Sequence, residues 1–405
     1  MVGPPPKHIS NGKETITFDE CAFGMDGSEI AQIYLTVMFG KKHTEYCKNR
    51  SRQDVARYTS GGKKFIKVNI PSIQEHPILP KGFNTEHEEY ELKVQDNGEV
   101  NIKAKFYPGV VRALDTLSQL VKKDESKRGI YMIEYAPIEV KDKPRYPYRG
   151  VMLDTAREFF FPDTIKQVID GMMLGKLNIL HWHFSDDESF PMYSETFPDL
   201  TDYTAFSKEE VYKPYMVKEI VEYGKIRGVK VVPELEGPGH MNALGSYPKL
   251  KDLIACYGDP SVVDNHANGG PPSAPINPVN EGTYKFLKSI MKDMAKNFDT
   301  DIWHLGGDEV GRDCWKSIHE VQEYMSKHNK SITDLHEHYM QKERQLLSEV
   351  NSEARAMYWY QNDRFHYHKD DILQLWSNVN KLQTQMNEHG DNYFVLSPSD
   401  RYYLN

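Results

Sequence analysis

Residues 150–182 read GVMLDTAREFFFPDTIKQVIDGMMLGKLNILHW and contain two short apolar runs on either side of a helical pattern. The runs are Gly150–Leu153 and Leu177–Trp182. Between them, apolar side chains recur at the spacing of one helix face, at Ile165, Val168, Ile169 and Met172. A strand–helix–strand unit predicts two parallel strands, because a parallel pair needs a long crossover connection that a helix usually supplies.

The same alternation continues along the rest of the chain. Further apolar runs follow at 229–233, 302–305, 356–359, 372–376 and 393–396. Helical spacing recurs between them, at Val217, Ile220, Val221 and Gly224 and at Tyr284, Leu287, Met291 and Met294. The seven predicted strands favour the α/β class and a (β/α)8 TIM barrel whose last strand is missing from this chain. A doubly wound open sheet is the alternative, although no Gly-rich phosphate loop follows the first strand.

The residues before the predicted barrel have a different pattern. Apolar and polar residues alternate on both sides of Asn97-Gly98, which predicts a β-hairpin, and residues 110–121 predict a helix. We interpret the chain as a flexible leader at 1–14, an N-terminal α+β domain at 15–140, a linker at 141–148 and the catalytic TIM barrel at 149–405.

Composition excludes some classes of function. The 405 residues have a mean hydropathy of -0.66, and the longest apolar-rich run, Ile30 to Phe39, is far shorter than the roughly 20 residues of a membrane-spanning helix. The net charge is -9 at pH 7, which disfavours a nucleic-acid partner, because binding phosphates needs a basic surface. No C-x-x-C pair is present, which disfavours a structural zinc site.

Polar and aromatic residues follow the predicted strands, where a TIM barrel carries its active site. They are Asp154, Arg157, His181, His183, Asp186, Asp187, Glu234, Glu236, His240, Asp308, Glu309, Trp359 and Trp376. Binding and cleaving a sugar needs such a set, with hydroxyl partners, an acid and flat apolar walls.

The segment Trp303–Glu309 reads WHLGGDE and holds two adjacent acids. Two glycines before these acids leave room for a ligand to approach the backbone. Adjacent side chains on an extended segment point in opposite directions, so both acids can face a ligand only if the backbone bends. A solvated surface turn is the alternative for this short segment on its own.

Several motifs together resemble glycoside hydrolase family 20, the β-N-acetylhexosaminidases. The family signature resembles His304–Glu309, and further motifs match in the family's order at 149–157, 180–191, 233–240 and, in the N-terminal domain, 114–120. The resemblance covers about residues 15 to 405 and is strongest to lysosomal or secreted eukaryotic members. It implies a retaining exo-β-N-acetylhexosaminidase that releases terminal β-linked GlcNAc or GalNAc from glycoconjugates or chitooligosaccharides.

In this family the substrate's own acetamido oxygen attacks C1, so the resemblance implies an oxazolinium intermediate, no cofactor and no metal. Glu309 corresponds to the general acid, Asp308 to the carboxylate that holds the acetamido N–H, and Tyr403 to the hydroxyl that bonds the acetamido oxygen. The implied substrate-binding residues are Arg157, Asp186, His240, Trp359, Trp376 and Asn405. The family's eighth strand, with a further Trp and a sugar-binding Glu, does not follow Asn405, and we therefore expect a C-terminally truncated barrel.

The resemblance to secretory-pathway proteins also leads us to expect disulfide bonds and glycosylation in this chain. It implies disulfides Cys21–Cys47 and Cys256–Cys314, with four free thiols as the alternative. Two sequons mark glycosylation sites at Asn49 and Asn329, although no signal peptide is present in this chain. We expect a lysosomal or secreted protein with a carbohydrate substrate, no nucleic acid and no membrane span. A homodimer is one option for the oligomeric state, which the sequence does not determine.

Two other functions compete with this interpretation. A metal-dependent hydrolase could use His181, His183, His240 and Asp308 as ligands, although the rest of a ligand set is missing. A truncated, non-catalytic sugar-binding protein is the second alternative. The intact pair of Asp308 and Glu309 argues against a decayed site.

Overall fold

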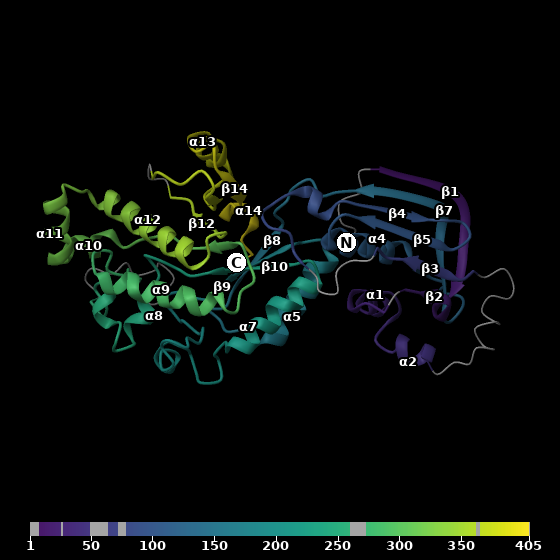
Figure 1. Ribbon diagram of the computed structural model, residues 1–405, viewed down its shortest axis with the longest axis horizontal. Coiled ribbons are helices and arrows are strands. Elements are labelled where there is room, and N and C mark those ends of the chain that lie inside the picture. The colour runs from purple at the N-terminus through teal and green to yellow at the C-terminus, as the bar shows by residue number, and fades with distance from the viewer. Residues whose placement is uncertain are drawn as a thin grey trace. The chain divides into compact units, whose positions relative to one another are not determined.

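The computed structural model describes residues 8–25, 27–48, 64–71, 78–259, 273–361 and 365–404. Two compact units make up the chain (Figure 1). The first contains residues 1–150, 166–178 and 222–230, and the second contains 151–165, 179–221 and 231–405.

The first unit is built on a mixed seven-stranded sheet with the order β1-β7-β4-β5-β3-β2, and β6 pairs with β7. The strands are β1 (His8–Asp19), β2 (Phe23–Gly24), β3 (Ile66–Asn69), β4 (Tyr90–Val94), β5 (Glu99–Ala104), β6 (Lys122–Lys123) and β7 (Ile130–Asp142). The helices are α1 (Glu29–Phe39), α2 (His43–Lys48) and α4 (Tyr107–Leu120).

The predicted hairpin is present as β4 and β5, which pair antiparallel with Leu92 opposite Ile102. Gly98 has φ +92°, and a Cβ there would lie 2.4 Å from the Phe65 carbonyl oxygen, so the turn needs glycine. Helix α4 begins three residues before the predicted helix, because Pro108 suits the first helical turn. Its face at Val110, Leu114 and Leu117 is wholly buried in the core of this unit.

The second sheet has seven strands in chain order from β8 to β14, and the neighbours from β10 to β14 pair in parallel. They are β8 (Gly150–Asp154), β9 (Ile179–His183), β10 (Lys230–Glu234), β11 (Ile302–His304), β12 (Arg355–Trp359), β13 (Ile372–Leu375) and β14 (Tyr393–Leu396). All residues of β9, β10 and β11 are buried, as expected for a parallel sheet covered on both faces.

The helices between these strands complete a curled, TIM-barrel-like fold. The longer ones are α5 (Pro162–Leu174), α7 (Pro214–Ile226), α9 (Glu281–Ala295) and α12 (Ile332–Val350). Shorter ones are α6 (Thr201–Thr204), α8 (Asn242–Gly245), α10 (Arg312–Ser317), α11 (His319–His328), α13 (Leu382–Glu388) and α14 (Ser399–Tyr402). Because the strands run in parallel, their carboxyl ends meet at one edge and bring together residues far apart in sequence.

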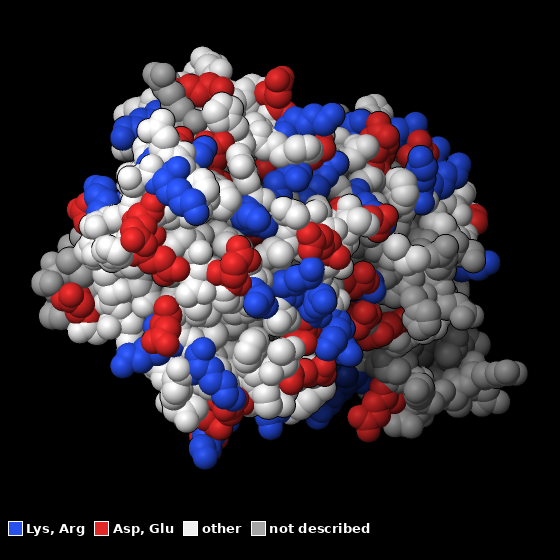
Figure 2. Space-filling model, turned by 60° about the vertical axis from the view of Figure 1, so that its left-hand side comes forward, with Lys and Arg blue, Asp and Glu red and all other residues white. Residues whose placement is uncertain are grey.

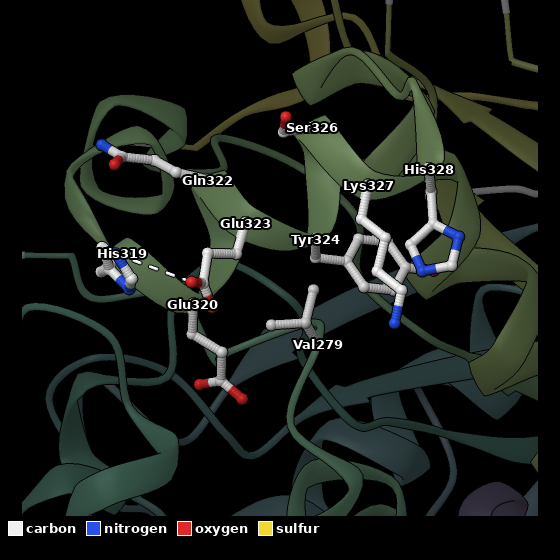
Figure 3. Close-up of a pocket in the computed structure, with 9 residues that line it drawn as sticks. All are labelled: Val279, His319, Glu320, Gln322, Glu323, Tyr324, Ser326, Lys327 and His328. Atoms are coloured by element: carbon white, nitrogen blue, oxygen red, sulfur yellow. Dashed lines mark ion pairs between the residues drawn. The ribbon is translucent and has the colours of Figure 1, made fainter.

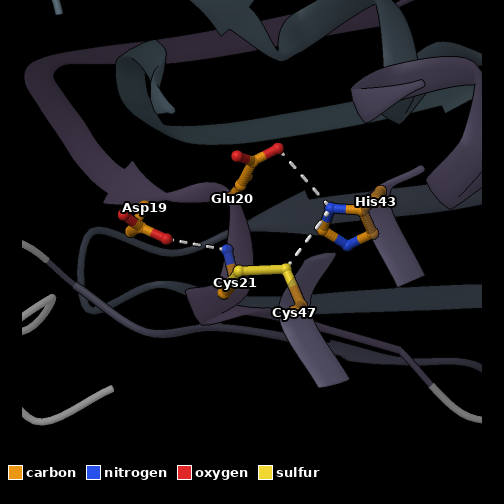
Figure 4. The surroundings of a disulfide bond; sticks show 5 residues. All are labelled: Asp19, Glu20, Cys21, His43 and Cys47. Atoms are coloured by element: carbon orange, nitrogen blue, oxygen red, sulfur yellow. Dashed lines mark hydrogen bonds and ion pairs between the residues drawn. A yellow bond between two sulfur atoms is a disulfide. The ribbon is translucent and has the colours of Figure 1, made fainter. Parts of the chain in front are cut away.

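Both predicted disulfides are present, Cys21–Cys47 and Cys256–Cys314. Figure 4 shows the first bond, where Asp19 accepts a hydrogen bond from the Cys21 backbone N–H and the His43 ring lies beside the Cys47 sulfur. Cys21 lies in the short 3-10 helix Glu20–Ala22 that follows β1, and Cys47 lies in α2, so the bond joins two elements of the first unit.

Two further observations bear on the partner. Among the described residues, no helix has the length and apolar character that crossing a membrane requires. The face drawn in Figure 2 carries basic and acidic side chains interspersed, without a continuous basic surface on that face.

Candidate active site

Glu234, the last residue of β10, is a wholly buried carboxylate surrounded by imidazoles. Its oxygens lie 2.8 Å from His181 Nε2, 2.5 Å from His183 Nδ1 and 3.0 Å from His304 Nδ1. The Trp359 indole N–H also donates a hydrogen bond to it, at 2.6 Å. Burial alone would raise the pKa of Glu234, but the three imidazoles outweigh burial and hold that pKa well below its ordinary value.

His183 connects this carboxylate to a second one, Asp186. Its Nε2 lies 2.7 Å from Asp186 Oδ2, while its Nδ1 contacts Glu234. Burial would lower the pKa of His183, but Glu234 and Asp186 together raise it well above its ordinary value. For Asp186, burial is outweighed by hydrogen bonds from His183 and His240, so its pKa is lowered. The side chains therefore form an alternating row of charges, with an imidazolium between two carboxylates.

Arg157 and Asp186 are brought together as the sequence predicted, with Nη2 2.8 Å from Asp186 Oδ2. Arg157 also contacts Asp154 at 2.6 Å and lies 3.7 Å from Glu188. Asp154 accepts the backbone N–H of Arg157 as well, which fixes the bend after β8. The Arg157 side chain as a whole remains 44% exposed, so it can still meet a ligand.

His240 joins this acidic cluster to the predicted acid pair. Its Nδ1 lies 3.1 Å from Asp187 and 3.2 Å from Asp186, and its Nε2 lies 3.4 Å from Glu309 and 3.9 Å from Asp308. Burial would lower the pKa of His240, but the hydrogen bonds with Asp186, Asp187 and Glu309 raise it well above the ordinary value. A charged imidazole thus faces both predicted acids.

The backbone after β11 bends so that both adjacent acids reach His240. Gly306, Gly307 and Glu309 have φ values of +63°, +108° and +44°. Glycine accepts the left-handed region without cost, whereas Glu309 is held there by its surroundings, a form of strain common at functional sites. The bend that the sequence required for two convergent acids is therefore present.

The two acids have different environments. The Glu309 side chain is 51% exposed, whereas that of Asp308 is 17% exposed. Burial raises the pKa of Asp308 to about 6, and the charges of Glu234 and Glu309 add to this effect while His240 opposes it. Neighbouring carboxyl groups held in different surroundings can take different roles in acid–base chemistry.

The predicted aromatic residues lie at separate places around this cluster. Trp359 is buried and rests against His304, with ring centroids 4.9 Å apart. Trp376 is half-buried and donates its indole N–H to the Tyr360 carbonyl oxygen. Tyr403 is 39% exposed, and burial together with the charges of Asp308, Glu234 and Glu309 raises its pKa to about 12. The predicted site residue Asn405 lies outside the described residues.

Comparison with known protein families identifies the family. Residues 146–405 match the model of the glycosyl hydrolase family 20 catalytic domain, and residues 2–120 match a model described as beta-acetyl hexosaminidase like. The chain belongs to glycosyl hydrolase family 20. The resemblance in the sequence is thereby confirmed, and the chain is a member of a family of glycoside hydrolases.

Similar proteins in family 20 are longer than this chain. Beta-hexosaminidase 1 of Coccidioides posadasii is 32% identical over 362 residues, which are 86% of this chain and 58% of the relative. Beta-hexosaminidase 1 of Arabidopsis thaliana is 34% identical over 367 residues, which are 86% of this chain and 63% of the relative. The crystal structure of a family 20 exo beta-N-acetylglucosaminidase from Vibrio harveyi has a TM-score of 0.74 at 24% identity, covering 98% of this chain and 60% of that one.

The sequence did not assign roles to several family 20 residues of this cluster. Glu234 and Glu236 were among the polar strand ends but received no function, His183 was considered only as a metal ligand, and Glu188 and His304 were not singled out. Their signal was positional, since Glu234 and His304 each end one of two neighbouring parallel strands and face each other in register. Reading the last residue of each strand as one shared layer would have found His183, Glu234 and His304.

The four residues proposed as ligands of a metal hydrolase do not form one cluster. His181 and His183 contact Glu234, whereas His240 contacts Asp308. Close groups of His and acidic residues do occur, for example His181, Glu234 and His304, whose ligand atoms lie within 4.8 Å of one another. None of the groups found among the described residues contains all four proposed ligands.

Two other predicted or visible features lie elsewhere. The sequon residue Asn49 lies outside the described residues, whereas Asn329 is exposed and ends α11 with φ +49°. A surface hollow runs along α11 (Figure 3) and is lined by Val279, His319, Glu320, Gln322, Glu323, Tyr324, Ser326, Lys327 and His328. The acid pair and its histidine do not line this hollow.

Proposed function

We propose that this chain carries the active site of a retaining exo-β-N-acetylhexosaminidase that works through an oxazolinium intermediate. The observation that supports the proposal most directly is the contact of one imidazolium, His240, with both Asp308 and Glu309. The chain spans 58% and 63% of two curated relatives, so the activity of the whole protein is part of this proposal. Relatives named beta-hexosaminidase and chitooligosaccharidolytic beta-N-acetylglucosaminidase suggest terminal β-linked GlcNAc or GalNAc as the substrate.

The two acids take separate roles in the proposed reaction. Glu309, which is half-exposed, protonates the oxygen of the leaving group. Asp308 accepts the acetamido N–H and so aims the acetamido oxygen at C1, which forms the oxazolinium ring as the glycosidic bond breaks. Water then attacks C1 from the face that the leaving group left, the C1–O bond of the oxazolinium ring breaks, and the Glu309 carboxylate takes the proton from the water. The sugar leaves with its anomeric configuration retained.

The other residues bind and orient the sugar in this proposal. Arg157, fixed by Asp154 and Asp186, holds ring hydroxyls, and Asp186 also supports His240 beside the acid. Trp359 and Trp376 form walls of the acetamido pocket, Tyr403 donates to the acetamido oxygen, and Asn405 contacts a sugar hydroxyl. Preorganised donors and walls of this kind place the internal nucleophile close to the reacting carbon.

Nuclear magnetic resonance tests the activity and its stereochemistry together. The chain is mixed with an aryl N-acetyl-β-glucosaminide, and the first sugar product is expected to be the β-anomer, which mutarotates later. Asp308→Asn should release sugar far more slowly than the wild type. An initial α-anomer would contradict the retaining mechanism, and tight sugar binding without turnover would favour the non-catalytic alternative.

The remaining features belong to the same proposal. The disulfides and the similarity to eukaryotic hexosaminidases favour a lysosomal or secreted glycoprotein, with Asn49 and Asn329 as its glycosylation sites. We also propose a homodimer and the division into 15–140, 141–148 and 149–405, with residues 8–14 of the expected leader lying instead in β1, which pairs with β7. The seven strands of the second sheet would be the first seven of a (β/α)8 barrel.

A further inference from the structure

Glu236, two residues after β10, is a buried carboxyl group that the proposed reaction leaves unused. The residue is 1% exposed. Its Oε1 accepts a hydrogen bond from the Gly237 backbone N–H at 3.2 Å, while its Oε2 is buried and makes no hydrogen bond among the described residues. A buried carboxylate with an unpaired oxygen is unfavourable, whereas a carboxylic acid can use its proton as a donor.

Charged groups on several elements face Glu236. Burial is the largest influence and raises its pKa well above the ordinary value. The negative charges of Asp308 and Glu234 raise this pKa further, and the imidazoles of His240 and His183 oppose them without reversing the shift. Two neighbouring carboxyl groups that cannot both ionise at low cost keep a proton on one of them.

Glycines on two loops allow this close packing. A Cβ on Gly306 would lie 2.0 Å from Glu236 Oε1, so the loop that leads to Asp308 rests directly on the Glu236 carboxyl. A Cβ on Gly237 would lie 2.3 Å from the Tyr339 hydroxyl oxygen, so the residue after Glu236 is also closely packed. The Glu236 carboxyl is therefore held in place and is kept from water.

Asp308 has a buried carboxylate oxygen that can accept a hydrogen bond from such a donor. Its Oδ1 is buried and makes no hydrogen bond among the described residues, whereas its Oδ2 lies 3.9 Å from His240 Nε2. Of the charged groups that act on Glu236, Asp308 has the strongest effect. One buried carboxyl oxygen without a partner thus occurs on each of two neighbouring acids.

We propose that Glu236 is a positioning residue that stays protonated and donates its O–H to Oδ1 of Asp308. This hydrogen bond would fix the plane of the Asp308 carboxylate and stabilise its negative charge, leaving Oδ2 to accept the acetamido N–H. The inference rests on the proposed function, because it assigns Glu236 a part in aiming the internal nucleophile.

Infrared spectroscopy without substrate tests the protonation of Glu236 independently of catalysis. The difference spectrum between wild type and Glu236→Gln at pH 7 should contain the carbonyl stretch of a protonated carboxylic acid. Loss of carboxylate bands instead would overturn the proposal. Because no substrate is present, this arm remains informative even if the wild type cleaves no N-acetylglucosaminide, a result that would count against the proposed function alone.

Kinetics then separate donation from mere packing. Glu236→Gln keeps a neutral donor, and its kcat/KM should stay within about threefold of the wild type. Glu236→Leu has a similar size and no donor, so its kcat/KM should fall roughly 10- to 100-fold, mostly through kcat. Glu343→Gln is the matched control, since Glu343 is equally buried and its pKa is raised by burial, with Tyr339 as its hydrogen-bond partner. The control should change kcat/KM less than about threefold.

Two kinetic outcomes would contradict the assignment. Equal losses in Glu236→Gln and Glu236→Leu would mean that the donor is not what matters. A shift of the acidic limb of the pH profile in Glu236→Gln, by about one pH unit toward lower pH, would mean that Glu236 is ionised beside Asp308 in the wild type. If Glu236→Leu fails to fold, this pH profile and the infrared spectrum still decide the question.

Discussion

Replacing Asp308 with Asn should make the protein more stable at neutral pH while it removes most of the activity. The pKa of Asp308 is raised from its ordinary value of 3.8 to about 6, chiefly by burial. The folded state therefore holds this proton more tightly than the unfolded chain does, and ionisation costs stability. Asn has nearly the same shape and never ionises, so the variant does not carry that cost.

The magnitude follows from the two pKa values. Each pKa unit corresponds to about 1.4 kcal/mol, so the interval from 3.8 to about 6 amounts to roughly 3 kcal/mol at most. The difference between variant and wild type should be absent below about pH 4, grow between about pH 4 and 6, and stay constant above that. Such a gain would be a case of an active site that lowers stability in favour of function.

Thermal unfolding of both proteins between pH 3.5 and 7.5 measures this profile. The wild type and Asp308→Asn should have the same melting temperature at the acidic end, and the variant should melt several degrees higher at pH 7. Asp391→Asn, at an exposed position, is the matched control and should show no comparable rise. A variant that is less stable than the wild type at pH 7, or a difference that does not depend on pH, would refute the reasoning.

Three other predictions concern the acid, the second disulfide and metals. In Glu309→Gln, the fold-loss of activity should be at least about 100 times larger on substrates with poor leaving groups than on activated aryl glycosides, since only the former need the proton. Equal losses on both kinds of substrate would argue against Glu309 as the general acid. The disulfide Cys256–Cys314 links the loop after β10 to the helix that follows Glu309, and its removal should reduce both kcat and thermal stability. Removal of Cys21–Cys47 should reduce the free energy of unfolding by about 2–4 kcal/mol and leave kcat unchanged. Dialysis against EDTA should leave turnover of the aryl substrate within about twofold of the untreated protein, and a loss restored by zinc would revive the metal-hydrolase alternative.

The strand–helix periodicity predicted the second sheet closely. The seven apolar runs correspond to β8–β14, for example 302–305 to Ile302–His304, because buried parallel strands need continuous apolar residues that a short sequence window reveals. The short helix α10 and the helix α11 after Glu309 were not predicted. Helix α11 buries only Val321, so its sequence carries little of the apolar stripe that predicts a helix.

The candidate site was predicted as a set of residues but not as an arrangement. Sequence order placed Asp186, His240, Asp308 and Glu309 at strand ends, and in the structure His240 lies next to each of the three acids. The left-handed backbone at Glu309 could not be predicted, because non-glycine residues adopt it only where the surrounding fold enforces it. The charge state of His240 also depends on four carboxylates from two other loops, Asp186 and Asp187 on one and Asp308 and Glu309 on the other, which no local pattern reveals.

The most direct test of the central claim compares two substrates that differ only at C2. The chain is given matched aryl β-glycosides, one with a 2-acetamido group and one with a 2-hydroxyl, and kcat/KM is measured for each. If the acetamido oxygen is the nucleophile, the N-acetylglucosaminide should be cleaved at least ~10³-fold faster, because the hydroxyl analogue has no internal nucleophile. Comparable cleavage of the two, or a sugar covalently trapped on a carboxylate of the protein, would contradict substrate-assisted catalysis and make Asp308 the candidate nucleophile.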